Sequence, residues 1–308
     1  MIVCIGEILA DMIGFNKDGV ISFNRYAGGA PFNVACDIKK LQGKAGFVGC
    51  VGNDLIGKFL LNYANNCGFD YLNIKLSDIY NTTLAFVELD EKGERSFSFY
   101  RKNTADYQLD ICEVENAVQR ANIVHLGSLM LSEEYGRMVA DKTVELARKY
   151  NKLLSFDVNY RSDIFKSDEQ AVKIYRKYLE QADIVKLSED ELYMFAGVND
   201  LDKALSIMNK PNRVTLVTLG AKGSVGIYNG AICHVPTISV KVVDTTGAGD
   251  AFYAGALTVL DKVNISSLNE KSLEQVLKFG NVCGALTTSG YGAVDACPTY
   301  DEVIKYLK

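Results

Sequence analysis

Histidine is scarce in this sequence: only His125 and His234 occur among 308 residues. Both lie in strand-like stretches, NIVHLG and CHVP, where a structural role is the simpler interpretation. Most enzymes with a serine or cysteine nucleophile use histidine as their base, so such mechanisms have few candidate residues here. A carboxylate is therefore favoured as a catalytic base.

Other features are also missing. Charged residues make up 23% of the chain at a net charge of −5, without basic blocks, which argues against nucleic acid or an anionic membrane as the main partner. The eight cysteines form no CxxC motif, which predicts reduced cysteines in a cytoplasmic protein rather than structural zinc or a disulfide framework. The apolar run MIVCIGEIL is too short for a signal segment or a membrane span and is expected to be a strand. Only four prolines and no long linker occur, so we expect one domain over 1–308.

Apolar strand-like runs alternate with helix-like runs along most of the chain. The strand-like runs are 2–6, 45–52, NIVHLG, KLLSFDV, DIVKLS and RVTLVTLG, and the helix-like runs are 31–43, 54–68, 132–150, 168–180 and one from 188. This order indicates an α/β fold with a parallel sheet covered by helices on both faces. The short strands lack strict alternation, which fits a sheet buried on both sides.

Two stretches break this pattern. Residues 12–26 predict a hairpin with a Lys-Asp-Gly turn, and residues 82–101 predict a longer hairpin that turns at Asp-Glu-Lys-Gly. We interpret them as one small sheet that projects from the main domain. Such a sheet can cover a ligand or pair with another subunit.

The stretch GNDLIGKF (52–59) has the glycine and lysine spacing of a P-loop. Phe59, however, replaces the Ser or Thr whose hydroxyl would hold magnesium, so a P-loop is disfavoured. Asp54 is better interpreted as a helix cap, with Gly57 allowing close packing.

The stretch DTTGAGDAF (244–252) lies between the β-branched run ISVKVV and a helix-like run, which predicts a strand, a turn and a helix. Gly247, Ala248 and Gly249 offer successive N–H groups at a helix N-terminus and so form an anion site. A carboxylate at Asp250 would repel a resting phosphate, but it can accept the proton of a bound alcohol while the amides stabilise the transferring group. The alternative is that Asp250 is only a helix-start acid favoured by the helix dipole. A dinucleotide fingerprint would need a third glycine that is absent.

A third glycine motif is AGGAPFNVA (27–35). Pro31 suits the first turn of a helix, and the backbone at Gly28 and Gly29 can approach a ligand closely. Asn33 can donate to and accept from a pair of sugar hydroxyls. A plain tight turn with a polar helix start remains the alternative.

Together these motifs resemble the PfkB carbohydrate kinase family, also called the ribokinase-like family, and they are most similar to bacterial fructokinases. The stretches that carry the resemblance are GGAPFNVA, GFVGCVGNDLIGKF (46–59) and DTTGAGDAFYAGAL (244–257), and the match covers essentially the whole chain. It implies a ribokinase-like three-layer sandwich with a mostly parallel central sheet and a small projecting β-sheet lid from about 12–30 and 82–108. It also implies transfer of the ATP γ-phosphoryl group to a sugar hydroxyl.

The resemblance assigns roles on the sugar side of this site. Asp250 matches the catalytic base, and Gly247, Ala248 and Gly249 match the anion hole. The implied substrate-binding residues are Asp11, Gly28, Gly29, Asn33, Arg101 and Arg161. For the two arginines the alternatives are a solvated strand end and an ion pair between Arg161 and Asp157.

The resemblance also assigns roles on the nucleotide side. The implied ATP-binding residues are Ser188, Thr218, Gly220, Gly223 and Asn281. Glu191 matches an acid that orders magnesium through water, with Ser188 standing where the family usually has Asn. Asp244 and the carbonyl of Thr246 match ligands of a monovalent cation, to which Gly292 can contribute. Ala296 stands where ribokinase has a Ser ligand, so dependence on potassium is left open.

The expected acceptor is fructose, phosphorylated at O6, with ATP and Mg²⁺. Ribose is disfavoured because GGAPFN lacks the lysine that ribokinases place after the glycine pair. The pair Tyr100 and Arg101 would also suit 2-keto-3-deoxygluconate, and a nucleoside is a more distant alternative. From other classes, a sugar-binding protein without catalysis and an NAD-dependent dehydrogenase stay open. A homodimer through the lid sheet is expected, as in relatives.

Overall fold

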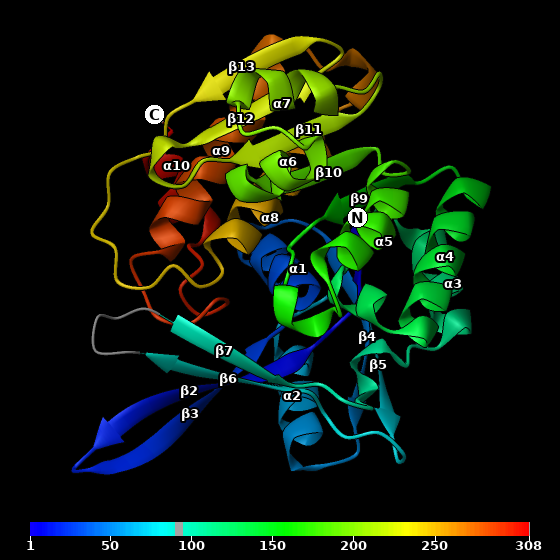
Figure 1. The fold of residues 1–308 in the computed structure, drawn as a ribbon, viewed down its shortest axis with the longest axis vertical. Coiled ribbons are helices and arrows are strands. Elements are labelled where there is room, and N and C mark those ends of the chain that lie inside the picture. Colours follow the sequence, from blue (N-terminus) through cyan, green and yellow to red (C-terminus); the bar gives the residue numbers. More distant parts are fainter. Residues whose placement is uncertain (90–94, 308) are drawn as a thin grey trace.

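The computed structural model describes residues 1–89 and 95–307, and in this part of the chain nine strands form one main sheet (Figure 1). From edge to edge the strands are β13 (Ala231–Val235), β12 (Ser224–Tyr228), β11 (Val214–Thr218), β10 (Ile184–Ser188), β9 (Leu153–Asp157), β8 (Ile123–Leu126), β1 (Ile2–Ile5), β4 (Ala45–Gly52) and β5 (Tyr71–Ser77). All neighbours pair in parallel except β11 with β12 and β12 with β13, which are antiparallel. The predicted mostly parallel sheet is confirmed.

Helices cover both faces of this sheet. One face carries α1 (Ala30–Lys40), α2 (Leu55–Asn66), α8 (Ala248–Leu260), α9 (Glu270–Thr287) and α10 (Tyr300–Lys305). The other carries α3 (Ile111–Arg120), α4 (Glu134–Lys149), α5 (Asp168–Leu179), α6 (Glu189–Ala196) and α7 (Leu201–Met208). In β1, Ile2 and Cys4 belong to one core and Val3 and Ile5 to the other, because successive side chains of a strand point to opposite faces. The three-layer sandwich follows from strands that are apolar on both sides.

A smaller sheet, with the strand order β3, β2, β6, β7, projects from the main body (Figure 1). Its strands are β2 (Leu9–Lys17), β3 (Val20–Gly28), β6 (Leu84–Leu89) and β7 (Arg95–Tyr100). The predicted Lys-Asp-Gly turn is confirmed: Asp18 and Gly19 both have positive φ, 53° and 83°, as a tight two-residue hairpin requires. Strands β2 and β6 pair in parallel, whereas both hairpins are antiparallel. The predicted Asp-Glu-Lys-Gly turn lies outside the described residues.

One predicted strand is wrong. The β-branched run at 238–243 has no ladder partner and follows an irregular course between β13 and α8. Val242 and Val243 are exposed, and they line the cavities described below rather than a buried sheet face. The strand β5 and the helices α3 and α7, which are partly exposed, were not predicted. Among the described helices, none is both long and apolar enough to cross a lipid bilayer.

The start of α2 is held as predicted. The Asp54 carboxylate accepts from Gly57 N at 2.7 Å, and it also accepts from Thr82 N, just before β6, at 2.8 Å. A Cβ at Gly57 would lie 1.9 Å from the carbonyl oxygen of Gly52, so only glycine allows this approach of α2 to the end of β4.

We therefore expect Gly57→Ala to lower the free energy of unfolding by about 1–3 kcal/mol, the usual cost of overpacking. Urea denaturation measures this change. The neighbouring exposed residue provides a control, because Lys58→Ala should stay within about 0.5 kcal/mol of the parent. Equal stabilities of the two variants would contradict the packing argument.

Candidate active site

A cavity of about 750 Å³ lies between the smaller sheet and the N-terminus of α8. Leu9 and Asp11 of β2 and Phe99 of β7 line it from the smaller sheet. The predicted sugar-side residues in its lining are Asp11, Gly29, Asn33, Arg161, Gly247, Gly249 and Asp250, and the predicted cation ligands Asp244 and Thr246 also line it. It lies where ligands bind in open α/β sheets, beside residues that follow the carboxyl ends of parallel strands.

A second cavity, of about 540 Å³, is adjacent to the first. The predicted ATP-side residues in its lining are Thr218, Gly220, Gly223 and Asn281, with Ala248 of the predicted anion hole. Both cavities share Val242, Thr245 and Gly249 in their walls. Two ligands could therefore meet at the start of α8, between the predicted sugar and nucleotide residues.

The helix α8 begins at this junction. Gly247 precedes it in a left-handed conformation, with φ of 77°, and a Cβ there would lie 2.6 Å from Ala293. Asp250 is half-buried in the first turn, and its Oδ2 accepts from Asn33 Nδ2 at 2.9 Å. Residues 217 positions apart are thus brought together, both of them on glycine-led helix starts.

The pKa of Asp250 is raised by burial, and the hydrogen bond from Asn33 and the cations of Lys186 and Arg161 oppose the rise only in part. The raised pKa therefore reflects the partly buried position of this helix start.

A pH dependence follows from this shift. If ionised Asp250 is the base, activity should fall with decreasing pH, and the midpoint should lie above the value of about 3.9 typical of a free aspartate. The acid limb of kcat/KM against pH measures the group in the free enzyme. A midpoint of this limb at or below the pKa of a free aspartate would contradict the assignment of Asp250 as a buried base.

Lys186 was not predicted as a site residue, although it lies in the strand-like run DIVKLS. It is buried in β10, its Nζ donates to Asp157 Oδ2 at 3.0 Å, and it lines the first cavity. Burial acts to lower the pKa of Lys186, but the carboxylates of Asp157, Glu191 and Asp250 outweigh this and raise it. A Cβ built on Gly249 would lie 3.2 Å from Lys186 Nζ, so a permanent cation faces the predicted anion hole.

Gly28 and Arg161 are placed by specific contacts. A Cβ at Gly28 would lie 2.2 Å from Asp11 Oδ2, so this glycine makes room for the Asp11 carboxylate across the β2–β3 pair. Arg161 follows β9, lines the first cavity, and donates from Nη1 to the carbonyl of Tyr160 at 2.9 Å. The salt bridge of Asp157 goes to Lys186 rather than to Arg161.

Besides Gly28 and Gly292, the predicted residues Arg101, Ser188 and Glu191 lie outside the described lining of both cavities. The Arg101 side chain is buried in a salt bridge to Asp106 at 2.7 Å and donates from Nη1 to Ser132 Oγ at 2.6 Å, which leaves its buried Nη2 without a hydrogen-bond partner among the described residues. Ser188 caps α6 in a capping box with Glu191. The two carboxylate oxygens of Glu191 accept from the N–H groups of Tyr160 and Ser188, both at 2.7 Å.

Asp244 is buried beside the anion hole. Its Oδ1 accepts from Thr246 N at 2.8 Å, and its Oδ2 accepts from Gly292 N at 3.4 Å. A buried carboxylate between two loops is a donor that suits a hard cation. The described residues contain no cluster of three His, Cys, Asp or Glu side chains that would hold a metal ion alone.

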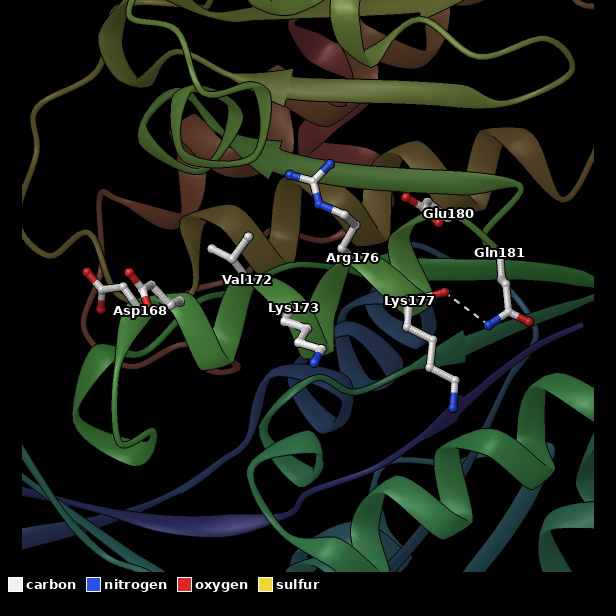
Figure 2. A pocket seen from close by; sticks show the side chains of 8 residues that line it. Asp168, Val172, Lys173, Arg176, Lys177, Glu180 and Gln181 are labelled. Carbon is white, nitrogen blue, oxygen red and sulfur yellow. Dashed lines mark hydrogen bonds between the residues drawn. The ribbon is translucent and has the colours of Figure 1, made fainter.

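Another hollow, of about 870 Å³, lies along the outer face of α5 (Figure 2). Its lining comes only from residues 168–181, and charged side chains of both signs, such as Lys173, Lys177 and Glu180, extend from this one segment. Side chains from a single helix do not converge on a ligand, so the two cavities at α8 are the better candidate site.

Comparison with known proteins agrees with this geometry. The model of the pfkB family of carbohydrate kinases matches residues 1–300. The chain belongs to this family. Fructokinase-1 of Zea mays is 36% identical over 315 residues, an alignment that spans all of this chain and 98% of the relative.

Two similar solved structures are fructokinases with ligands. The fructokinase of Xylella fastidiosa with bound ATP superposes with a TM-score of 0.91 at 32% identity, covering 99% of this chain and 97% of that one. A double mutant of the Vibrio cholerae O395 fructokinase, with fructose, ADP and a potassium ion bound, gives a TM-score of 0.90 at 30% identity, covering 100% and 98%. The PfkB kinase is thus similar to fructokinases over its full length.

Proposed function

We infer that this PfkB kinase is an ATP-dependent fructokinase that forms fructose 6-phosphate. The observation that carries this inference is the pair of adjoining cavities that share Gly249, with Asp250 on one side and the predicted ATP residues on the other. Full-length similarity to fructokinases, including structures with fructose, ADP or ATP, supports the choice of substrates.

In the proposed reaction, Asp250 accepts the proton of the sugar O6 hydroxyl as this oxygen attacks the γ-phosphorus. The bond to the bridging oxygen breaks and ADP leaves. The N–H groups of Gly247, Ala248 and Gly249 stabilise charge on the transferring group, and Lys186 adds a cation beside them. Positioning and charge stabilisation account for most of the catalysis in such transfers.

Sugar binding is proposed for the remaining residues of the first cavity. Asp11 and Asn33 face it from the smaller sheet and from α1, and both can bond to sugar hydroxyls. Gly29 keeps the backbone close to the bound sugar, Gly28 leaves room for the Asp11 carboxylate, and Arg161 offers a cation to phosphate oxygens. Arg101, which is held by Asp106 outside the described lining, would join them through its Nη2 if that atom became accessible.

Two ions complete the proposal. Magnesium takes most of its ligands from water and nucleotide phosphates, and so needs few from protein. Both Glu191 oxygens accept backbone N–H groups, which fits contact through water. Asp244 with the carbonyls of Thr246 and Gly292 would hold a monovalent cation, whose charge would strengthen the anion hole.

The smaller sheet is proposed both as a lid over the first cavity and as a dimer interface. Its outer face carries an aromatic cluster in which the rings of Phe23 and Phe86 lie 5.2 Å apart and those of Phe86 and Tyr100 lie 5.1 Å apart. Val20 and Ile21 at the hairpin tip are 63% and 66% exposed. A second copy would cover this apolar surface.

Sedimentation equilibrium should give the mass of a dimer for the parent. The variant Phe23→Glu, which places a charge in the aromatic cluster, should lower the measured mass toward that of a monomer.

The test of function is a substrate panel of fructose, other hexoses, ribose and 2-keto-3-deoxygluconate, with ATP and Mg²⁺ and with or without K⁺. We expect the highest kcat/KM for fructose, measured as ADP release. A higher value for the keto-deoxy acid would reassign the acceptor. The kinase assignment would be overturned if NAD but not ATP stabilised the protein against heat and no sugar of the panel led to ADP release from ATP.

A further inference from the structure

Two cysteines, one in α1 and one just after α2, lie in contact. Cys36 of α1 and Cys67, which directly follows α2, have their sulfur atoms 3.6 Å apart. Cys36 is buried and Cys67 is half-exposed. The remaining described cysteines have no such pairing among their hydrogen bonds, so this pair differs from a set of inert core thiols.

A cavity of about 630 Å³ opens beside this pair. Its lining includes both cysteines, Lys39, Lys40 and Tyr63. Because Cys36 donates its S–H to Cys67, the pKa of Cys67 is lowered; the Lys40 ammonium acts in the same direction, while burial and Asp295 oppose the shift in part. Burial raises the pKa of Cys36, which stays a thiol. A half-exposed cysteine whose thiol pKa is lowered, beside a second cysteine, is the arrangement found in oxidation-sensitive sites.

We propose that Cys67 and Cys36 form an oxidation site for peroxides, with Cys67 as the reacting residue and Cys36 as the resolving one. The Cys67 thiolate attacks one oxygen of hydrogen peroxide, an S–O bond forms, the O–O bond breaks, and the departing hydroxide takes a proton to give water. Cys36 then attacks this sulfur, the S–S bond forms and the S–O bond breaks. The Cys36 proton leaves with the departing oxygen as a second water.

The disulfide should disturb the active site through α1. An S–S bond is about 2.05 Å long, so the two sulfur atoms must approach by about 1.5 Å. Asn33, one turn before Cys36, holds Asp250. Lys40, one turn after Cys36, donates to the carbonyls of Val294, Asp295 and Cys297, at 2.6, 3.1 and 3.2 Å. This loop packs on Gly247 through Ala293, so α1 contacts the catalytic turn from two sides.

The experiment treats the full chain with hydrogen peroxide and maps the cysteines by mass spectrometry without reduction. We expect a linked peptide pair that contains Cys36 and Cys67 and lacks two hydrogen atoms. Fructose kinase activity should fall at least about tenfold, because displacements of about 1 Å can cost still more, and thiol reductants should restore it. Cys67→Ser and Cys36→Ser should keep their activity under peroxide, whereas Cys112→Ser, which lacks the exposed cysteine of α3, should behave like the parent.

Peptide mapping does not depend on the substrate, so it separates this proposal from the assignment of fructose. Oxidised Cys112 without the linked pair in the same sample would overturn the proposal. A linked pair that leaves activity unchanged would overturn the coupling through α1. Irreversible oxidation of Cys67 in place of the disulfide would overturn the role of Cys36.

Discussion

Asp250→Asn lowers kcat by about 10²–10⁴-fold, the usual contribution of a general base, and leaves the fold and sugar binding intact. The amide has the shape of the carboxylate and can still accept from Asn33 Nδ2, which lies 2.9 Å from Asp250 Oδ2. It cannot take the proton of the sugar hydroxyl. A coupled ADP assay measures the rate, and a calorimetric titration with fructose measures binding. A rate near that of the parent would show that Asp250 is not the base.

The same variant should be at least as stable as the parent at pH 8. Burial raises the pKa of Asp250 in the folded state above its unfolded value, so the folded chain binds this proton more tightly. The resulting stabilisation is fully present below the unfolded pKa and is lost as pH rises through the folded pKa. Asn stays neutral throughout, so its advantage in Tm should grow with pH. A lower Tm for Asp250→Asn at pH 8 would indicate that the carboxylate holds the turn together.

Lys186→Met is expected to lower kcat by about 10²-fold or more, because a preorganised charge at the transferring group is lost. Lys186 Nζ faces Gly249 and lies in the wall of the first cavity. The variant should also lose stability, and more so at pH 8 than at pH 6. Burial raises the pKa of Asp157 to about 7 against the opposite effect of Lys186, so at pH 6 the carboxyl left behind is mainly neutral.

Asp157→Asn is the matched control for this variant. It breaks the same 3.0 Å salt bridge but keeps the cation beside the anion hole. We expect it to retain most of kcat in the ADP assay, with its unfolding followed by urea denaturation at both pH values. Equal losses of kcat in Lys186→Met and Asp157→Asn would mean that the pair has only a structural role.

Local sequence motifs were enough to predict those site residues that lie together in one short segment. Gly247 to Asp250 are contiguous, Thr218 is the last residue of β11 and Gly220 lies just beyond it, so their placement depends on a strand end or a helix start alone. Lys186 was missed although the sequence holds a signal: a lysine within an apolar run that is buried on both sides needs a charged partner.

The direction of the Arg101 side chain depends on tertiary contacts that cannot be predicted from the sequence. Its partner Asp106 lies in a short 3₁₀ helix, where Thr83 and Thr104 also donate to the same carboxylate. Likewise, residues 238–243 have strand-like composition but lack a neighbouring strand to pair with. A segment of strand-like composition becomes a strand only where the rest of the fold provides a neighbouring strand with free hydrogen-bonding groups.

Strand β2 extends the cover of the first cavity and also presents Asp11 to its interior. A hexose hydrogen-bonded to Asp11 would therefore draw β2 and the smaller sheet toward the cavity, and no other ligand would be needed for this closure. Sugar binding and the exclusion of water from the cavity would then result from the same movement. A mutation that weakens the contact between Asp11 and the sugar should also increase hydrolysis of ATP by water.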